Sequence, residues 1–418
     1  MTVRRVAWLV AAVMLLGGAG VALADEAAAP IKVGTALDLS SPLAGFVSEY
    51  SEGQRDYITL INGRGGIKGH PVELVIRDHG GDLKRGLAAY QSMKSEGVVL
   101  MDFLNTAISR AVVPQALADG MDVITLFHGR ADAADGRVFP TIFPLTPTFW
   151  SQAADLVKFI EDEEVEELDG KRIALVAIDA PLGHEVEPVL NELSRRLRFK
   201  FKAFYYPAPG NDQAAAWKGA RRFEPRWTLI WGAGPTQAES VRQALQNGFR
   251  LDHVAANVAI SEEDLAGIDA AKAAGLLRFE GVASGRDLPI IKAILDEVVT
   301  PGKGAGKAER VGHGYYNAGV ASMVFFAEAA RLALESEGEP LTPEKLKKGF
   351  EQLREFTAED LVAPTTITAR DHQGGGRGRI VQWDGQKWIE RRRWFAAYQD
   401  IVWNLILKNS AQFKEAGK

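Results

Sequence analysis

The stretch INGRGGIKGHPVELVIRDHGGD, residues 61–82, contains six glycines and decides between two classes of protein. A glycine-rich phosphate-binding loop follows a strand and opens a helix, because the helix N-terminus supplies free N–H groups and the positive end of the helix dipole. Here the glycines follow a helical pattern at 52–61 and precede the strand pattern VELVIRD at 72–78. Position 68 is lysine and no G-x-x-x-x-G-K-[ST] occurs, so the spacing of the nucleotide motifs is also missing. The cluster is predicted to be a helix-to-strand turn, with Asn62-Gly63 ending the helix.

Strand and helix patterns alternate along the first third of the chain, and again after a break at residues 141–152. The first series comprises strands that begin at Ile31 and at 72–78, 98–103 and 121–127, with helices at 52–61, 85–96 and 108–119. The second series comprises a helix at 152–160 and strands at 172–178, 199–207, 228–234 and 253–260. Such alternation is typical of parallel sheets with helices on both faces. We therefore predict an α/β protein with two doubly wound, Rossmann-like units.

The last third of the chain is less regular and is predicted to return to both units. The sequence predicts a strand near EGVAS at 280–284, a helix at 288–299 and a long apolar helix at 315–334. The apolar residues of the long helix need a sheet to pack on, and the first unit provides one. In RGRIVQWDGQKWIERRRW, residues 377–394, Asp384-Gly385 between apolar-polar alternations predicts a hairpin in the second unit. The tail that follows has apolar residues at helical spacing and is predicted to pack on one of the units.

The first 24 residues have the pattern of a secretory signal peptide. Arg4 and Arg5 precede an apolar run at 6–16, and Ala22-Leu23-Ala24 gives the small-x-small pattern of a cleavage site. The apolar run is shorter than the ~20 residues that a membrane-spanning helix needs, so cleavage near Ala24 is expected rather than anchoring. No later stretch is expected to span a bilayer. The mature chain is predicted to be soluble and to lie outside the cytoplasm.

Composition and charge exclude several classes of function. The chain has 418 residues, of which 46% are hydrophobic and 25% charged, so it is long enough for two globular domains. It contains no cysteine, which excludes disulfides, iron–sulfur clusters and thiol catalysis. Losing two arginines with the signal peptide reduces the 49 basic residues to 47 against 54 acidic ones, and a net charge near −7 does not suit a nucleic-acid partner. No cofactor is expected.

Four landmarks together resemble one protein family. They are VGTALDLSSPLAGF at 33–46, INGRGGIKGHPVELVIRD at 61–78, GMDVITLF at 120–127 and WDGQKW at 383–388. This set resembles the type I periplasmic substrate-binding proteins of ABC importers, and in particular the branched-chain amino acid (Leu/Ile/Val) binding proteins. The resemblance extends from about Ile31 to Trp394, which is nearly the whole mature chain.

The resemblance implies two α/β lobes that close over a ligand like a Venus flytrap and are joined by three crossover segments. The lobes are expected at 31–147 plus 281–365 and at 148–280 plus 366–394, with a C-terminal helix at 395–418 and hinges near 145–148, 278–284 and 363–369. Ligands of open α/β sheets bind beyond the carboxyl ends of the strands, so the cleft is expected between the lobes. The implied partners are a small-molecule ligand and the permease and ATPase subunits of an ABC importer in the inner membrane. The binding protein itself is expected to be a monomer.

The expected ligand-binding residues lie in loops at strand ends. By the family's layout they are Ser41, Phe46, Asn105, Thr106, Ala107, Phe127, His128, Gly129, Trp150, Leu182, Trp231 and Asn257. Asn105 and Thr106 precede a helix that starts near Ile108, where free N–H groups can receive a carboxylate and where side chains also serve as caps. His128 can donate to a polar ligand or serve as a structural group. Phe46 and Trp231 are expected to contact the ligand rather than the core.

One departure from the family's pattern bears on the ligand. Amino-acid-binding members place an acidic residue of the second lobe against the ammonium group of the ligand, whereas HVAANVAI has Ala256 and Asn257 in that region. Burying an ammonium without a counter-charge costs several kcal/mol. Unless Glu262 or Asp179 substitutes, the ligand is expected to be a carboxylate or amide with an apolar body, such as an aromatic or short aliphatic acid.

Two other functions remain open from the residues. A sensor module has the same fold and pocket but docks on a signalling receptor. A secreted hydrolase needs a nucleophile or a metal site, yet the chain has no G-x-S-x-G or H-E-x-x-H and its seven histidines are scattered. The carboxylates of Glu262-Glu263, and Asp371 next to His372, are interpreted as a helix start and a turn. We therefore expect no catalysis and no metal site.

Overall fold

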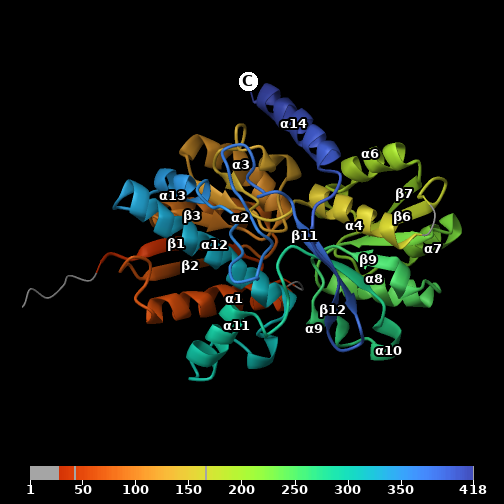
Figure 1. Cartoon of the computed structure of the whole chain (residues 1–418), viewed down its shortest axis with the longest axis horizontal. Helices are drawn as coiled ribbons and strands as arrows, with labels where there is room; N and C mark the ends of the chain where they lie inside the picture. Colours follow the sequence, from red (N-terminus) through yellow and green to blue (C-terminus); the bar gives the residue numbers. More distant parts are fainter. Residues whose placement is uncertain (1–27, 42–43, 165–166, 418) are drawn as a thin grey trace, which may run out of the picture.

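The computed structural model describes residues 28–41, 44–164 and 167–417. The predicted signal peptide, residues 1–24, lies outside the described residues. The described chain forms two lobes that lie side by side, each built on its own sheet (Figure 1). The predicted α/β fold with two doubly wound lobes is confirmed.

Lobe 1 is built on a parallel sheet with the strand order β2-β1-β3-β4-β5. Its strands are β1 (Ile31–Leu37), β2 (Val72–Asp78), β3 (Leu100–Asp102), β4 (Asp122–Ile124) and β5 (Ile142–Phe143). The interior strand β1, between β2 and β3, is buried along almost its whole length. A parallel sheet is expected to be buried in this way, because the helices that connect its strands cover both faces.

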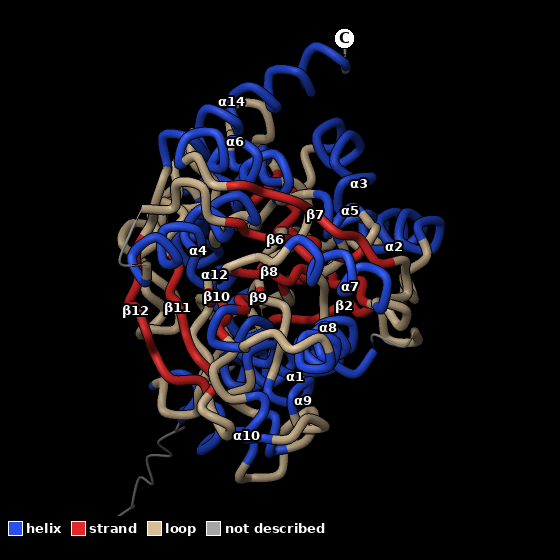
Figure 2. The backbone as a smooth tube through the Cα atoms, turned by 90° about the vertical axis from the view of Figure 1, so that its right-hand side faces the viewer, coloured by secondary structure: helices blue, strands red, loops and turns tan. Residues whose placement is uncertain are grey.

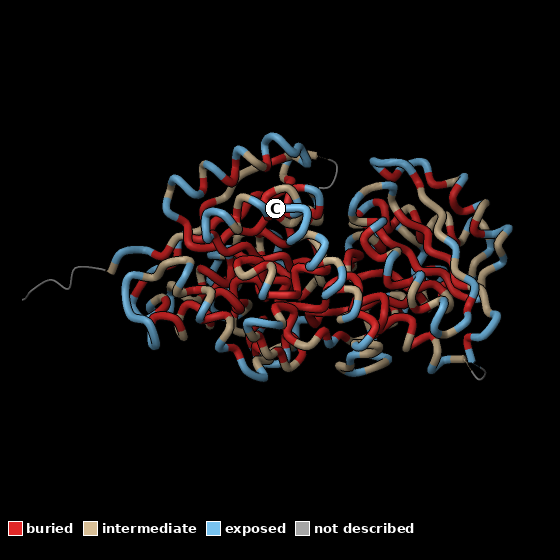
Figure 3. The backbone as a smooth tube through the Cα atoms, turned by 90° about the horizontal axis from the view of Figure 1, so that it is seen from above, coloured by how far each residue is buried: buried red, intermediate tan, exposed pale blue. Residues whose placement is uncertain are grey.

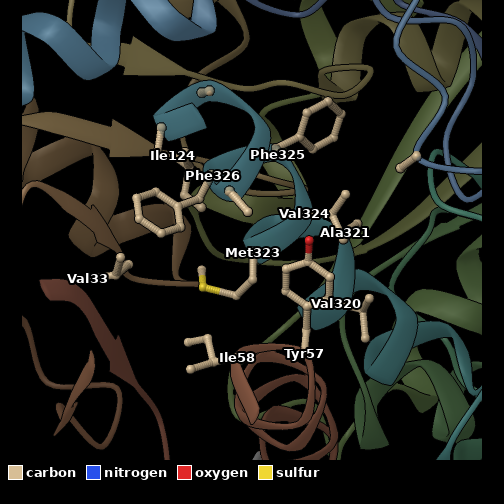
Figure 4. Close-up of a cluster of buried hydrophobic side chains, with 14 of the residues drawn as sticks. Val33, Tyr57, Ile58, Ile124, Val320, Ala321, Met323, Val324, Phe325 and Phe326 are labelled. Carbon is tan, nitrogen blue, oxygen red and sulfur yellow. The ribbon is translucent and has the colours of Figure 1, made fainter. Parts of the chain in front are cut away.

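The helices of lobe 1 pack around a close contact between two long helices. They are α1 (Ala44–Gly63), α2 (Leu83–Ser95), α3 (Thr106–Asp119), α11 (Pro289–Ile294) with its π-helical extension η3 (Leu295–Val299), α12 (Gly314–Glu337) and α13 (Pro343–Phe350). A Cβ at Gly53 of α1 would lie 2.1 Å from the carbonyl oxygen of Tyr316, so this approach requires glycine. Figure 4 shows Ile58 of α1 and Met323 and Phe326 of α12 in the core beside this contact.

The helix α12 is long and apolar enough to cross a membrane by length and composition alone. The expectation that no later stretch has these properties is therefore wrong for this helix. Of its apolar window, 83% is buried inside the protein. α12 is the central helix of the lobe 1 core.

The glycine-rich stretch forms the turn between α1 and β2, as predicted. The helix ends at Gly63, as predicted, although the left-handed conformation expected there occurs at Gly65 (φ +99°) and Gly66. The Asn62 side chain donates to the carbonyl oxygen of Val72 at 2.9 Å and accepts from its N–H at 2.8 Å, which fixes the end of the helix to the strand. Gly66 has φ +74°, and a Cβ there would lie 2.1 Å from the carbonyl oxygen of His70. The turn therefore requires glycine at this position.

Lobe 2 is built on a mixed sheet with the strand order β12-β11-β10-β9-β8-β6-β7. Its strands are β6 (Arg172–Ile178), β7 (Lys200–Tyr206), β8 (Trp227–Trp231), β9 (Val254–Ala256), β10 (Leu277–Glu280), β11 (Gly378–Trp383) and β12 (Trp388–Phe395). The predicted hairpin at Asp384 is β11–β12, and its two antiparallel strands form one edge of the sheet (Figure 2). The strand predicted at 280–284 is displaced, because β10 ends at Glu280 and the following residues leave the sheet.

The helices of lobe 2 cover this sheet and complete a second core. They are α4 (Phe149–Glu163), α5 (Pro181–His184), α6 (Glu187–Leu197), α7 (Ala214–Phe223), α8 (Pro235–Gln246), α9 (Glu262–Leu265) and α10 (Ala270–Ala273). Short 3-10 helices lie at η1 (Ala131–Ala134), η2 (Leu251–His253) and η4 (Ala308–Arg310). Buried residues gather in the interior of each lobe and exposed residues on the outside (Figure 3).

The crossover segments between the lobes are bonded to one another. The chain crosses between β5 and α4, between β10 and α11, and between α13 and β11. The backbone N–H and the hydroxyl of Thr148 in the first crossing both donate to Gln373 Oε1 in the third, each at 3.3 Å. Val282 in the second crossing pairs with Val362 in an antiparallel bridge. The three segments therefore form one connected joint.

A buried ion cluster lies beside this joint. Glu280 is 1% exposed and pairs with Arg278 and with Arg379, the latter at 2.6 Å. The hydroxyl of Ser284 also donates to Glu280 Oε1, at 2.6 Å. Burial raises the pKa of Glu280, but the charges of Arg379 and Arg278 outweigh that effect and lower it to about 2. The ionised carboxylate is therefore required to neutralise two arginines where the lobes meet.

Replacing Glu280 by glutamine should lower the free energy of unfolding by about 3–5 kcal/mol, because the buried Arg278 then loses its acidic partner and Arg379 keeps only Glu390, at 3.6 Å. Urea unfolding at pH 7 measures this loss, with Glu224→Gln as the matched control on an exposed ion pair. The folded pKa of about 2 lies below the ordinary value of 4.5, so in the wild type the contribution is present above pH 4.5 and is lost as the pH falls toward 2. Equal unfolding midpoints for both variants would contradict this role.

The C-terminal helix α14 (Gln399–Ala416) packs against both lobes, whereas the sequence predicts packing on one. Ile406 lies in the core of lobe 2. One turn later, the Ser410 hydroxyl donates to Asp135 Oδ2 of the β4–β5 connection at 2.9 Å. In Figure 1 the helix rises above the junction of the lobes.

Candidate functional site

A mostly apolar cavity of about 220 Å³ lies between the lobes, beyond the carboxyl ends of the parallel strands. Lobe 1 contributes Phe46, Tyr50, Leu104, Asn105, Thr106, Ala107, Phe127, His128, Gly314, Tyr315 and Ala318. Lobe 2 contributes Ile178, Ala180, Pro181, Leu182, Ala233, Val258 and Ala259. In lobe 1 the lining segments follow β3 and β4 or belong to α1 and α12, and in lobe 2 they follow β6, β8 and β9. This is where open α/β sheets bind ligands.

The lining residues determine which kinds of ligand the cavity can bind. Among the described lining residues there is no aspartate, glutamate, lysine or arginine. The polar groups come from the start of α3, from His128 and from the two tyrosines. Its volume lies below the range of drug-sized pockets, so it suits a small molecule.

The start of α3 gives the cavity one anion-receiving end. Asn105 is the N-cap, and its Oδ1 accepts from the N–H of Ile108 at 3.0 Å. The earlier N–H groups of a helix have no acceptor within the helix, and here they belong to Thr106 and Ala107, which line the cavity. The positive end of the helix dipole adds to their attraction for a carboxylate or a carbonyl oxygen.

His128 is held by partners behind the cavity wall. Its Nε2 lies 3.0 Å from Asp102 Oδ1 and its Nδ1 lies 2.8 Å from the Ser109 hydroxyl. Asp102 is fully buried and also accepts from the Tyr50 hydroxyl at 2.5 Å. With both ring nitrogens engaged, His128 has no free donor for a ligand in this arrangement, in contrast to the expected donation. Its imidazole ring instead forms part of the wall.

The Ser109–His128–Asp102 chain contains the residue types of a hydrolase triad, but its geometry does not suit catalysis. Ser109 is 0% exposed and does not line the cavity. A nucleophile must reach the bond that it attacks. This serine therefore acts as a structural partner that orients the histidine.

The two lobes touch at the rim of the cavity through an aromatic pair and a glycine. The ring of Phe46 lies 4.6 Å, centroid to centroid, from that of Tyr315, and the Tyr315 hydroxyl accepts from Gly234 N at 3.2 Å. Gly234 belongs to lobe 2 and has φ +52°. A Cβ on Gly234 would lie 2.4 Å from Cδ1 of Phe46. Glycine at this position therefore permits the observed approach of the lobes.

The structure brings together seven of the residues expected in the site. They are Phe46, Asn105, Thr106, Ala107, Phe127, His128 and Leu182, all of which line the cavity. Phe127 has φ +62°, a left-handed conformation unusual for a bulky residue, and its ring packs against Gly281 in the second crossing. Their contacts with a ligand stay a prediction.

Five expected residues lie outside the cavity. Ser41 donates its hydroxyl to Asp38 Oδ2 at 2.7 Å, and Gly129 (φ +86°) lies against Thr125. Trp150 borders a separate space and donates to the carbonyl oxygen of Glu185 at 2.6 Å. The other two, Trp231 and Asn257, are fully buried. Position at a strand end does not decide which way a side chain points.

Trp231 and Asn257 have structural partners inside lobe 2. Trp231 packs edge-on against Phe149, with ring centroids 5.7 Å apart, in contrast to the expected ligand contact. Asn257 Oδ1 accepts from Ala259 N at 3.2 Å, and its Nδ2 donates to the carbonyl oxygen of Gly232 at 3.2 Å. Asn257 thus fixes the loops that carry Ala233 and Ala259 into the cavity wall.

Sequence reasoning missed the helical residues of the wall. Tyr50 is on α1, and Tyr315 and Ala318 are on α12, so all three come from helices rather than strand-end loops. Tyr315 directly follows Gly314 at the start of α12, and this position at a helix start is the signal that was available in the sequence.

Comparison with known proteins identifies the family of this chain. The sequence pattern of the periplasmic binding proteins matches residues 30–387. The chain belongs to the periplasmic binding protein family. This confirms the resemblance noted in the sequence, and with it the expectation of a non-enzymatic binding protein.

Individual relatives agree in fold and differ in described ligand. A Leu/Ile/Val-binding protein homolog from Brucella melitensis is 28% identical over 108 residues, which is 26% of this chain and only 29% of that relative's length. A solved structure from the Pseudomonas fluorescens group, described as an ABC transporter permease, is 29% identical with a TM-score of 0.85, covering 93% of this chain and 97% of that one. A fatty acid ABC transporter substrate-binding protein from Thermomonospora curvata is 20% identical with a TM-score of 0.75, covering 90% and 94%.

Substituting Gly234 by alanine should hold the lobes apart, because the new Cβ would overlap the ring of Phe46. Gly248→Ala is the matched control, since Gly248 is also left-handed (φ +74°) but a Cβ added there would have nothing within 4 Å. The Gly234 backbone (φ +52°, ψ −126°) lies outside the left-handed helical region, so Gly234→Ala also carries a larger backbone cost than the control, and unfolding measurements on both variants correct for it. Small-angle X-ray scattering should show a larger radius of gyration for Gly234→Ala alone. Identical scattering for both variants would contradict this function of Gly234.

Proposed function

We propose that this periplasmic binding protein captures a small carboxylate or amide with an apolar body in the inter-lobe cavity and delivers it to an ABC importer. The observation that supports this most is the combination of an uncharged, aromatic-rich wall with one helix N-terminus. The helix end offers N–H groups to an oxygen of the ligand, and the rest of the wall offers apolar contact.

A ligand with an ammonium group fits this cavity poorly. The two carboxylates that were considered as substitutes for the missing acid lie elsewhere: Glu262 accepts from the N–H of Gly314 at 3.1 Å, and Asp179 is paired with His184 at 2.8 Å and is largely exposed. Neither lines the cavity. An ammonium there would lose its hydration without gaining a counter-charge, which costs several kcal/mol.

Aromatic side chains favour a flat apolar body for the ligand. Phe46, Tyr50, Phe127, His128 and Tyr315 all border the space. Aromatic rings prefer offset or edge-to-face contacts, and such contacts contribute beyond simple burial. Solved structures described as a branched-chain amino acid ABC transporter with bound valine and as a fatty acid ABC transporter substrate-binding protein share the fold, so the ligand class must be inferred from the cavity wall of this chain and not from the fold.

Capture is proposed to work by hinge closure at the three crossings. A ligand shifts the balance between open and closed lobes only by its difference in affinity for the two forms, so it must contact both walls. The helix start at Asn105 belongs to lobe 1, whereas Leu182 and Val258 belong to lobe 2. A ligand on the α3 terminus that also reaches these two side chains would meet that requirement.

The proposed setting is the periplasm, with the protein acting as a monomer. The signal pattern of residues 1–24 supports export, and the family supports a small-molecule ligand. The proposed partners are the permease and ATPase subunits of an importer in the inner membrane. No catalytic step is required, because the ligand is released unchanged.

Matched ligand pairs test the absence of an ammonium site. Protein unfolded and refolded to remove bound molecules should bind 3-phenylpropanoate more tightly than phenylalanine, and 4-methylpentanoate more tightly than leucine. Each pair differs by one ammonium group, and desolvating it should reduce affinity at least tenfold, about 1.4 kcal/mol. Isothermal titration calorimetry measures both affinities. Tighter binding of the amino acids would contradict the proposal.

A second pair of variants locates the site. Ala318→Leu fills part of the cavity and should weaken binding of the preferred acid at least tenfold. Ala327→Leu is the matched control, because Ala327 lies on the same helix but borders a separate surface pocket of lobe 1. Equal loss of binding in both variants would show that α12 was disturbed as a whole.

A further inference from the structure

A second, polar cavity of about 270 Å³ adjoins the first and shares Phe46 with it. Gly45, Phe46 and Glu49 of α1 form its lobe 1 wall. Pro235, Ala238, Arg242, Ser261, Glu263 and Asp264 form its lobe 2 wall. Glu49 is 0% exposed in this setting. Because elements of the other lobe cover it, separation of the lobes would return Glu49 to water.

Glu49 is surrounded by charged groups from every element packed around it. They are Glu52 on α1, Arg242 on α8, Glu262, Glu263 and Asp264 on α9, Arg310 on η4 and His313 before α12. His313 Nδ1 lies 3.5 Å from Glu49 Oε1. Within the described chain neither carboxylate oxygen of Glu49 has a hydrogen-bond partner. A buried carboxylate without such partners is unfavourable in its ionised form.

Polar contacts across the lobes surround this carboxyl group. Arg310 of lobe 1 pairs with Glu52 at 3.0 Å and with Glu263 of lobe 2 at 3.0 Å. Glu262 of lobe 2 accepts from Gly314 N of lobe 1 at 3.1 Å. The cluster therefore exists in this form only while the lobes are in contact.

The pKa values of the groups in this cluster shift in different directions. Burial raises the pKa of Glu49 to about 8, with His313 opposing and Glu263 adding to the rise. Glu49 and Arg310 lower the pKa of Glu263, so that carboxylate stays ionised. The pKa of His313 is raised, because its acidic neighbours outweigh burial. Burial also raises the pKa of Asp264, to about 7, which makes Asp264 the competing titratable group.

We propose that closing of the lobes over Glu49 takes up one proton, so that this cluster is a pH-dependent lock on the closed form. The proton resides on the Glu49 carboxyl group, which can then donate a hydrogen bond to the ionised Glu263 across the lobe boundary. Arg310 holds Glu263 in place from the other side. The inference rests on the proposed hinge closure and adds proton uptake to it.

The sign of the pH effect follows from the two forms of Glu49. In the closed form its pKa is about 8, and in the open, hydrated form it returns toward the ordinary 4.5. Between these values the closed form holds a proton that the open form releases. Raising the pH from about 5 to 8 therefore disfavours closing, by up to tenfold in the closed-to-open ratio per pH unit for one proton.

Fluorescence resonance energy transfer between two dyes, one on each lobe, tests the lock without knowledge of the natural ligand. The chain contains no cysteine, so Lys84→Cys on lobe 1 and Lys218→Cys on lobe 2, both exposed, give two unique labelling sites. Transfer efficiency is measured from pH 5.5 to 8.5, first without ligand and then with saturating 3-phenylpropanoate. The closed fraction should fall as pH rises. Glu49→Gln should make it nearly independent of pH, whereas Glu344→Gln, an exposed control, should behave as the wild type.

The outcomes separate this inference from the proposed function. A closed fraction that changes with ligand but not with pH would overturn the lock and leave the hinge intact. Transfer that responds to neither would count against the hinge itself. Loss of the pH response in Asp264→Asn but not in Glu49→Gln would also overturn the assignment. Should Glu49→Gln not fold, Glu263→Gln removes the acceptor instead and should reduce the pH response.

Discussion

The carboxyl ends of the parallel strands in the two lobes face each other, and this arrangement determines where the cavity lies and which segments line it. Loops after β3 and β4, together with the starts of α1 and α12, form one wall of the cavity, and the segments that follow β6, β8 and β9 form the other. Each wall belongs to a separate hydrophobic core. Under the proposed hinge closure, a ligand is enclosed when the two lobes, each with its own core, come together, and the contacts made at that moment decide what is captured.

The contacts between the lobes divide into an apolar centre and a polar cluster beside it. The centre offers aromatic side chains and a helix terminus, with Phe46 and Tyr315 meeting Gly234 at its edge. The acidic cluster around Glu49 lies on one side of it. The joint, by contrast, is fixed by the buried Glu280 ion cluster and by bonds between the crossings. Hinge closure at the crossings requires that a few of their residues change backbone conformation while each lobe stays rigid.

Much of the fold was predictable from the sequence, because the spacing of apolar residues along the chain indicates which residues are buried. β2, β6 and the Asp384 hairpin occur where apolar patterns and turn residues indicated them. Element ends were less predictable: β10 ends at Glu280, so the strand expected at 280–284 is displaced, and local sequence does not show the bonds between Asn62 and Val72 at the end of α1. The helix α14 contacts both lobes for a similar reason, since its partners are distant in the chain.

The site was predictable in its loops but not in its side-chain directions. Asn105 to Ala107 line the cavity because an N-cap follows a parallel strand. Trp231 lies in the core instead, since successive strand residues point to opposite faces and one sequence does not show which face meets the cleft. Tyr50 and Tyr315 come from helices whose placement over the cleft depends on long-range packing.

Mass spectrometry of protein purified without unfolding tests the central claim most directly. The cavity's lack of charged side chains among its described residues predicts that a small acid or amide with an apolar body, and no amine, is released on denaturation in about equimolar amount. Release of an α-amino acid in that amount would contradict the account.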